Sequence, residues 1–196
     1  FECRSLLGYC RNEKLKLSMG RNERTVEGLR AVDRERTTIS SNSKQRQRTN
    51  RKGVASQNGD DDEVRYKRVE EIAHVYDALL QDARAITNLP GGRTTPTSDH
   101  TEEDEFLLEA NANVLRLRAL RSYYLGRMYA SSLISRYPEA IALYDQTSIL
   151  ASEAAEEMLA CEGLDDEGVR SMAELEEEVV GARVRAEVSL FLGGSG

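Results

Sequence analysis

The apolar positions of this chain recur at intervals of three and four residues over long stretches, which is the period of an amphipathic helix. The clearest pattern lies between residues 62 and 89, where the spacing is followed by Val69, Ile72, Tyr76, Leu79, Ala83 and Ile86. Pro90-Gly91-Gly92 follows and ends the pattern, because proline and paired glycines do not sustain a helix. The spacing predicts one long helix over 62–89.

Two more helices are predicted to pack as a close hairpin within Ala119–Leu150, with the second helix opening at Pro138. A glycine inside a helix costs about 1 kcal/mol relative to alanine, so Gly126 is expected to serve close packing against the second helix. The predicted core of the hairpin consists of Leu125, Gly126 and Tyr129 on the first helix, with Ala140 and Tyr144 on the second.

The helical pattern extends beyond this hairpin in both directions. The first helix is expected to begin at a capping box formed by Thr101 and Asp104, and the second to continue to about Gly163. A last helix is expected to begin at a second capping box, Ser171 and Glu174. Residues 62–192 are therefore predicted to be an all-α domain of four long antiparallel helices.

The N-terminal third is less apolar. Residues 1–38 predict a helical hairpin with a thin apolar face and a turn at Gly20, and residues 39–61 predict a flexible basic linker, because they contain almost no apolar residues. The chain starts at Phe1 and closes with Gly193-Gly194-Ser195-Gly196, so a fragment is expected, with 193–196 as a tail or an added linker.

Charge divides the chain into two unequal parts. The formal net charge is −7. Residues 1–53 hold 14 Lys and Arg against 6 Asp and Glu, a net charge of +8, and the remainder holds 13 against 28, a net charge of −15. A basic N-terminal arm attached to an acidic body suggests an interaction with a polyanion.

Five basic residues inside the linker are the candidates for RNA contact. They are Lys44, Arg46, Arg48, Arg51 and Lys52, with no acidic residue between them. Lys and Arg on a polar segment can pair with phosphates and release counterions. Because no aromatic residue is interleaved for base stacking, such contacts would be made to the RNA backbone. The alternative is an ordinary solvated linker.

No arrangement typical of an enzyme or a cofactor site is found in the sequence. It lacks the Gly-x-Ser-x-Gly elbow of hydrolases and the Gly-Lys placement of a phosphate-binding loop. Three cysteines and two histidines in unrelated contexts do not make a metal site, and no apolar run is long enough to cross a membrane. We therefore expect no catalytic residues, cofactor, metal, small-molecule substrate or membrane insertion.

Two family resemblances can be traced to particular residues. The Leu-Gly-x-x-Tyr pattern at Leu125–Tyr129 and the run Tyr137–Tyr144 resemble the two halves of a tetratricopeptide repeat, with a longer link between them. The stretch Val75–Asp82, the stop at Asn88–Gly91 and the region Ala119–Ala151, in that order, resemble the C-terminal, tetratricopeptide-like part of the 68-kilodalton subunit of the signal recognition particle.

This second resemblance implies antiparallel helices packed as tetratricopeptide-like hairpins and a non-catalytic scaffold. Its implied partners are the 72-kilodalton subunit of the particle and the particle RNA, in co-translational protein targeting to the endoplasmic reticulum. It further implies a cytoplasmic location, with a nucleolar stage during assembly. The alternative is a general tetratricopeptide adaptor, unrelated to the particle, that binds a peptide in its groove.

Overall fold

Helices make up nearly all of the chain that can be described. The computed structural model describes residue 10 and residues 13–32, 58–88, 100–161 and 166–193. An N-terminal helix covers 13–32, and four more helices follow: α2 (Asn58–Thr87), α3 (His100–Tyr129), α4 (Tyr137–Ala160) and α5 (Asp166–Gly193). The described residues contain no strand, and the predicted all-α class is confirmed.

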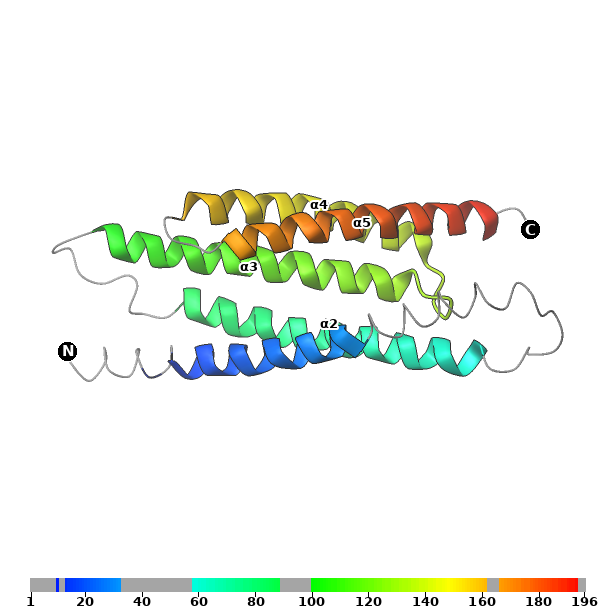
Figure 1. Cartoon of the computed structure of the whole chain (residues 1–196), viewed down its shortest axis with the longest axis horizontal. Helices are drawn as coiled ribbons and strands as arrows, with labels where there is room; N and C mark the ends of the chain where they lie inside the picture. Colours follow the sequence, from blue (N-terminus) through cyan, green and yellow to red (C-terminus); the bar gives the residue numbers. More distant parts are fainter. Residues whose placement is uncertain (1–9, 11–12, 33–57, 89–99, 162–165, 194–196) are drawn as a thin grey trace.

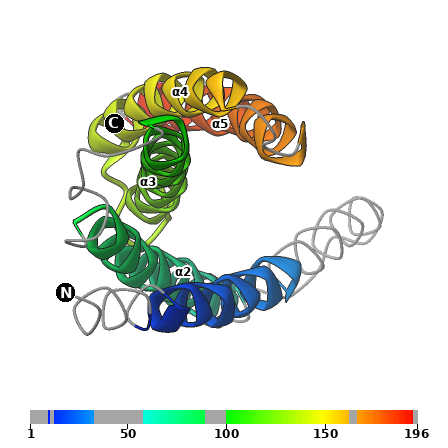
Figure 2. The same ribbon diagram turned by 90° about the vertical axis from the view of Figure 1, so that its left-hand side faces the viewer.

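The helices lie side by side and alternate in direction along the chain (Figure 1). Each of α3, α4 and α5 packs against the helix before it, the α3–α4 interface being the most extensive, and helix 13–32 lies against α2. Viewed from the end, the row of helices curves into a C, with helix 13–32 and α5 at its two ends (Figure 2). The curvature gives the molecule a concave inner side.

The apolar faces predicted from the sequence are the faces that become buried. All six predicted positions of α2 are buried, from Val69 to Ile86. In α4 the buried face consists of Ala140, Tyr144, Thr147, Leu150, Ala151, Ala154 and Met158, so alanine occupies much of it. Small side chains let two helix backbones approach closely, and this face lies between α3 and α5.

The closest approach in the core joins α3 to α4 at Gly126. A Cβ atom built on Gly126 would lie 2.7 Å from Cε1 and 2.9 Å from Cδ1 of Tyr144. The ring therefore occupies the space that a side chain would need. Nearby, the Ser122 hydroxyl donates a hydrogen bond of 3.2 Å to the Leu143 carbonyl across the same interface. Any residue larger than glycine at position 126 must displace a buried aromatic ring.

A tight loop returns the chain from α3 to α4. Ser135 has a φ of 53°, in the left-handed region that side chains seldom adopt, and its N–H donates to the Ser131 carbonyl at 2.8 Å. Glu139 stands in the first turn of α4, where the helix dipole favours a negative charge. Its own backbone N–H and the Arg136 side chain, at 2.8 Å, hold the pKa of the Glu139 carboxyl below its usual range.

Two predicted boundaries are wrong. The chain does not turn at Gly20, because residues 13–32 form one uninterrupted helix. Met19 and Val26 are buried in the core on the same side of this helix, and this packing outweighs the roughly 1 kcal/mol that a helical glycine costs. The capping box at Ser171 is also wrong: α5 begins at Asp166, and the contact of Val169 with the core extends it.

Smaller differences concern helix ends. α2 begins at Asn58, four residues before the predicted start, and its described helical part ends at Thr87. α3 begins at His100, one residue before the predicted capping Thr101. The side chains of residues 101–107 lie outside the described part, as do residues 39–57 and the terminal residues 194–196.

Replacement of Gly126 by leucine should destabilise the protein. The new side chain must push the Tyr144 ring out of a packed position, so we expect the free energy of unfolding to fall by about 1–3 kcal/mol. Gly28→Leu is the matched control, because Gly28 is also helical but has open space around it. That change should raise the free energy by about 0.8 kcal/mol through helix propensity alone. Urea denaturation of both variants checks the pair, and equal shifts would contradict the contact.

Candidate functional site

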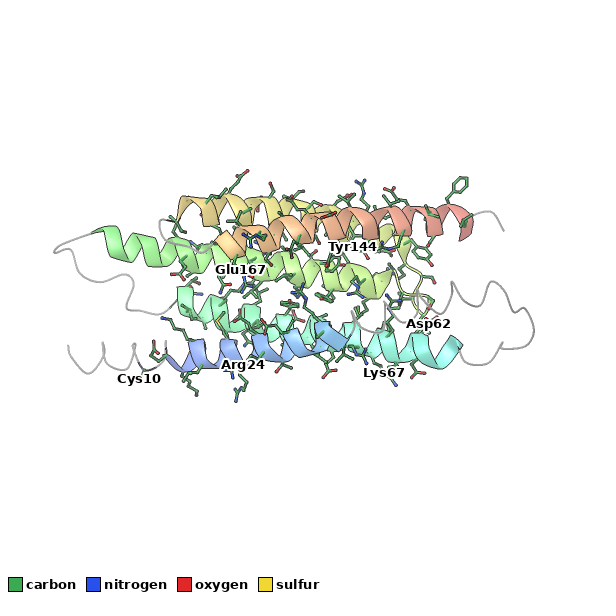
Figure 3. All side chains as sticks on the ribbon, viewed as in Figure 1. Cys10, Arg24, Asp62, Lys67, Tyr144 and Glu167 are labelled. Atoms are coloured by element: carbon green, nitrogen blue, oxygen red, sulfur yellow. The ribbon has the colours of Figure 1, made fainter. Side chains whose placement is uncertain are left out.

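A basic stripe follows the outer side of helix 13–32. Lys14, Arg21 and Arg24 are exposed, and their spacing of seven and three residues places them on one face. Arg24 lies at the outer edge of the molecule (Figure 3). The face shared by Cys10, Lys14, Leu17, Ser18, Arg21, Arg24, Thr25 and Gly28 contains no acidic residue. Lys14, Arg21 and Arg24 are called the basic stripe below.

Two of the three acidic residues of this helix, Glu13 and Glu23, are engaged in ion pairs within the protein. Glu13 lies 3.8 Å from Lys16 in an ion pair along the helix. The Glu23 carboxylate accepts a hydrogen bond of 2.8 Å from Arg116 on α3, and this half-buried pair fixes helix 13–32 to the body. The stripe therefore presents positive charge on a helix whose orientation is set by contacts on its other side.

The five RNA-contact candidates of the linker, Lys44, Arg46, Arg48, Arg51 and Lys52, lie outside the described residues. Their place in the sequence is between Val32, where the described part of the N-terminal helix ends, and Asn58, where α2 begins. Both of these helices pack into the body. The linker candidates thus follow the basic stripe in the sequence and precede a second packed helix.

A groove of about 860 Å³ follows the concave side of the row of helices. It is lined by residues of helix 13–32, α2, α3, α4 and α5, and by Ser131 and Ser132 of the loop after α3. Four arginines and three carboxylates are among its lining residues: Arg30, Arg65, Arg127, Arg185, Asp62, Glu177 and Glu178. We call this space the concave groove.

A chain of tyrosines supports the floor of the concave groove. The Tyr76 ring of α2 stacks on Tyr124 of α3 at 5.5 Å between centroids, and Tyr124 meets Tyr123 edge to face at 5.3 Å. Tyr123 then lies 6.2 Å from Tyr144 of α4. Aromatic pairs in such geometries contribute about 0.5–1.5 kcal/mol beyond their burial. The chain of rings therefore links three successive helices.

Two arginines are held against these rings. The Arg127 guanidinium lies 5.8 Å from the Tyr123 centroid and 5.4 Å from the Tyr124 centroid, within the range of a cation–π interaction. Arg30 donates a hydrogen bond to the Tyr76 hydroxyl. Tyr123 in turn donates to the Glu178 carboxylate. The groove floor is therefore polar and positively charged, although it rests on an aromatic core.

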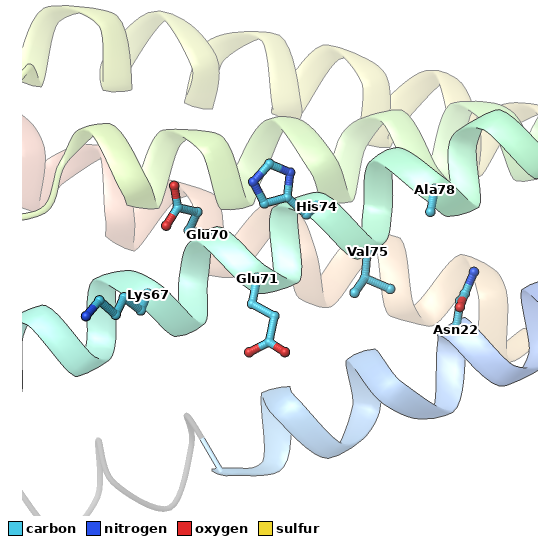
Figure 4. A pocket seen from close by; sticks show the side chains of 7 residues that line it. All are labelled: Asn22, Lys67, Glu70, Glu71, His74, Val75 and Ala78. Carbon is cyan, nitrogen blue, oxygen red and sulfur yellow. The ribbon is translucent and has the colours of Figure 1, made fainter.

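A second hollow of about 530 Å³ lies between helix 13–32 and α2 (Figure 4). Its side chains diverge, because Glu70 and His74 point to one side of α2, whereas Glu71 points to the other. Among the described residues, no group of three His, Cys, Asp or Glu side chains could hold a metal ion. Within the same part of the chain, no helix is both long and apolar enough to cross a membrane.

The residues predicted for the hairpin core are brought together to different degrees. Ala140 and Tyr144 are fully buried, and Gly126 lies against the Tyr144 ring. Leu125 and Tyr129 are only partly buried, and the Arg136 guanidinium covers the Tyr129 ring at 5.4 Å. All five residues thus pack in or against the core, and Tyr144 also lines the concave groove.

Sequence reasoning did not identify the basic stripe or the groove. The expected turn at Gly20 divided the stripe, although the spacing of Lys14, Arg21 and Arg24 is visible once the helix is continuous. The groove had no local signal, since Arg30, Arg65 and Arg185 come together only through the curvature of the whole row.

Comparison with known proteins gives one family. The family model described as RNA-binding signal recognition particle 68 matches residues 2–195. The match covers the N-terminal helix, the basic linker and all four long helices, whereas the resemblance seen in the sequence began only near residue 62. No solved structure matches the chain.

The buried tyrosines should make the fold sensitive to alkali. Burial raises the pKa of Tyr76 and of Tyr144 to about 12, against an ordinary value near 10. A raised folded-state pKa means that stability is complete below pH 10 and is lost as the pH rises towards 12. From pH 9 to pH 11 each ring should lower the free energy of unfolding by about 1.4 kcal/mol.

The variant Tyr144→Phe isolates one of these rings. Because phenylalanine does not titrate, the loss of unfolding free energy between pH 9 and pH 11 should be smaller by about 1.4 kcal/mol than in the wild type. Urea denaturation at the two pH values measures both proteins. An identical loss in the two would show that Tyr144 is not kept protonated by the fold.

Proposed function

The chain belongs to the RNA-binding signal recognition particle 68 family, and we propose that it is a non-catalytic scaffold that holds particle RNA through its basic N-terminal part. The observation that supports this most strongly is the extent of the family match, which includes both the basic stripe and the basic linker. The contact residues in this proposal are Lys14, Arg21 and Arg24 with the five linker candidates, Lys44, Arg46, Arg48, Arg51 and Lys52.

The chemistry of these residues suits the phosphate backbone. Lys and Arg neutralise phosphates and release condensed counterions, which gives affinity without reading the base sequence. The stripe faces away from the aromatic core, so it offers no ring for base stacking. Contacts of this type depend on the shape and charge of the RNA. The acidic outer surface of α4 and α5 would repel the same phosphates and so favours one orientation.

The helical body serves as the rigid part of the scaffold in this proposal. We assign the α3–α4 hairpin as a tetratricopeptide-like unit, on the close packing at Gly126 and Tyr144. Assembly with the 72-kilodalton subunit and a role in co-translational targeting to the endoplasmic reticulum belong to the same proposal, and so does a cytoplasmic location with a nucleolar stage. They rest on membership of the family.

Salt dependence of RNA binding tests the contact residues. Each phosphate contact on a single strand changes the slope of log affinity against log salt concentration by about −0.7. Replacing the five linker residues by glutamine should therefore flatten the slope by about 3.5, and replacing Lys14, Arg21 and Arg24 should flatten it by about 2.1. Filter-binding titrations with particle RNA at several salt concentrations measure these slopes.

A variant with Arg84→Gln and Arg170→Gln is the control for charge alone. Both residues are exposed, one on α2 and one on α5, and neither lies on the stripe or in the concave groove. This variant should keep the wild-type slope. If it flattens the slope as strongly per charge as the stripe variant does, the stripe has no special part in binding RNA.

Assembly with the other subunit is tested by co-purification. The full chain, expressed with an affinity tag in eukaryotic cells, should recover both the 72-kilodalton subunit and particle RNA from the extract. Ribonuclease treatment of the extract separates a direct protein contact from one that RNA bridges. Recovery of the RNA without the subunit would limit the scaffold role to RNA, and recovery of neither would contradict the proposal.

A further inference from the structure

We infer that the concave groove is a second binding site, which takes an extended polypeptide segment carrying several carboxylates. The groove is a polar hollow on the opposite side of the N-terminal helix from the basic stripe, and its volume is within the range of ligand sites in proteins. The inference concerns a ligand other than RNA and does not depend on the RNA contacts proposed above.

The arginines give the groove its preference for carboxylates. Arg65 on α2 and Arg185 on α5 are exposed and stand on opposite walls. No ion pair within the described part of the chain engages either of them. A guanidinium binds a carboxylate through two parallel hydrogen bonds, which makes arginine the usual partner of that group. A peptide with separated carboxylates could therefore contact both walls.

Two of the three carboxylates of the groove accept hydrogen bonds within the protein. Asp62 accepts a hydrogen bond of 2.9 Å from the Ser132 hydroxyl, and Glu178 accepts one from Tyr123. These internal donors reduce the demand of the two acids for an external cation. With four arginines against three carboxylates, the lining keeps a net positive charge, which favours an anionic ligand.

A peptide fits this groove better than a nucleic acid does. Tyr123, Tyr124 and Tyr144 are only 5%, 3% and 2% exposed, so their ring faces are covered and cannot stack on bases. A nucleic acid carries a continuous row of phosphates, whereas a polypeptide can place its carboxylates at the separated arginines of the two walls. Its backbone N–H groups can in addition donate to carboxylate and hydroxyl oxygens of the groove.

Two details of the groove wall suit a polar ligand. The Ser131 hydroxyl is buried and has no hydrogen-bond partner among the described residues, a state that costs about 1–3 kcal/mol unless a ligand or water satisfies it. Gly181 stands beside Arg185, and a Cβ atom there would lie 3.3 Å from Nη1 of that arginine. The missing side chain leaves the guanidinium room to lie along α5 at the edge of the groove.

Fluorescence anisotropy with a defined probe tests the site. The probe is a dye-labelled ten-residue peptide of alternating glutamate and serine, with matched glutamine–serine and lysine–serine peptides for comparison. The full chain should bind the glutamate–serine peptide and neither of the other two peptides. Arg65→Gln with Arg185→Gln should weaken this binding at least about tenfold, because each charge-assisted hydrogen bond contributes more than a neutral one.

The Arg84→Gln and Arg170→Gln variant removes the same charge from the same two helices outside the groove and should keep the wild-type affinity. Thermal melting of both variants should match the wild type, since all four residues are exposed. The groove variant should also keep its RNA salt slope. Absence of glutamate-peptide binding, equal weakening in the two variants, or loss of RNA binding in the groove variant would each overturn the inference.

Discussion

The close approach of α3 and α4 at Gly126 determines the positions of the elements around it. Because position 126 has no side chain, the Tyr144 ring lies directly on the α3 backbone and reaches Tyr123. Tyr123 contacts Tyr124, which stacks on Tyr76 of α2. The distance between α3 and α4 thus sets where three helices stand and where the groove floor lies. A wider separation of α3 and α4 would move the Tyr144 ring away from Tyr123 and interrupt this chain of rings.

The buried faces of the helices were predicted well from the sequence, because burial of one helix face spaces the apolar residues three and four positions apart. The buried positions of α2 and α4 could be predicted without knowing which helices pack against them, since only one face of each helix is apolar. Helix ends were predicted less well where tertiary contacts outweigh local signals. Gly20 has the composition of a stop, yet Met19 and Val26 keep the helix continuous. Ser171 is a suitable cap, yet Val169, two residues earlier, already packs against the core.

The concave groove could not be predicted, for a different reason. Its arginines lie at positions 30, 65, 127 and 185, so no short stretch of the sequence contains two of them. Their approach depends on the curvature of five helices, which follows from the sum of all the packing angles. The sequence shows that residues 123 and 144 are tyrosines. Only the fold shows that the Tyr123 ring lies under the Arg127 guanidinium and that the Tyr144 ring packs against Gly126.

Helix 13–32 belongs to both surfaces, and this joins them physically. Its outer face holds the basic stripe, while Arg30 near its end lines the groove and donates to Tyr76. The pair of Glu23 with Arg116 ties the same helix to α3. If this helix left its place, the groove would lose one wall and Tyr76 would lose a donor. A peptide bound in the groove, as proposed above, would therefore stabilise the docked helix and with it the orientation of the basic stripe.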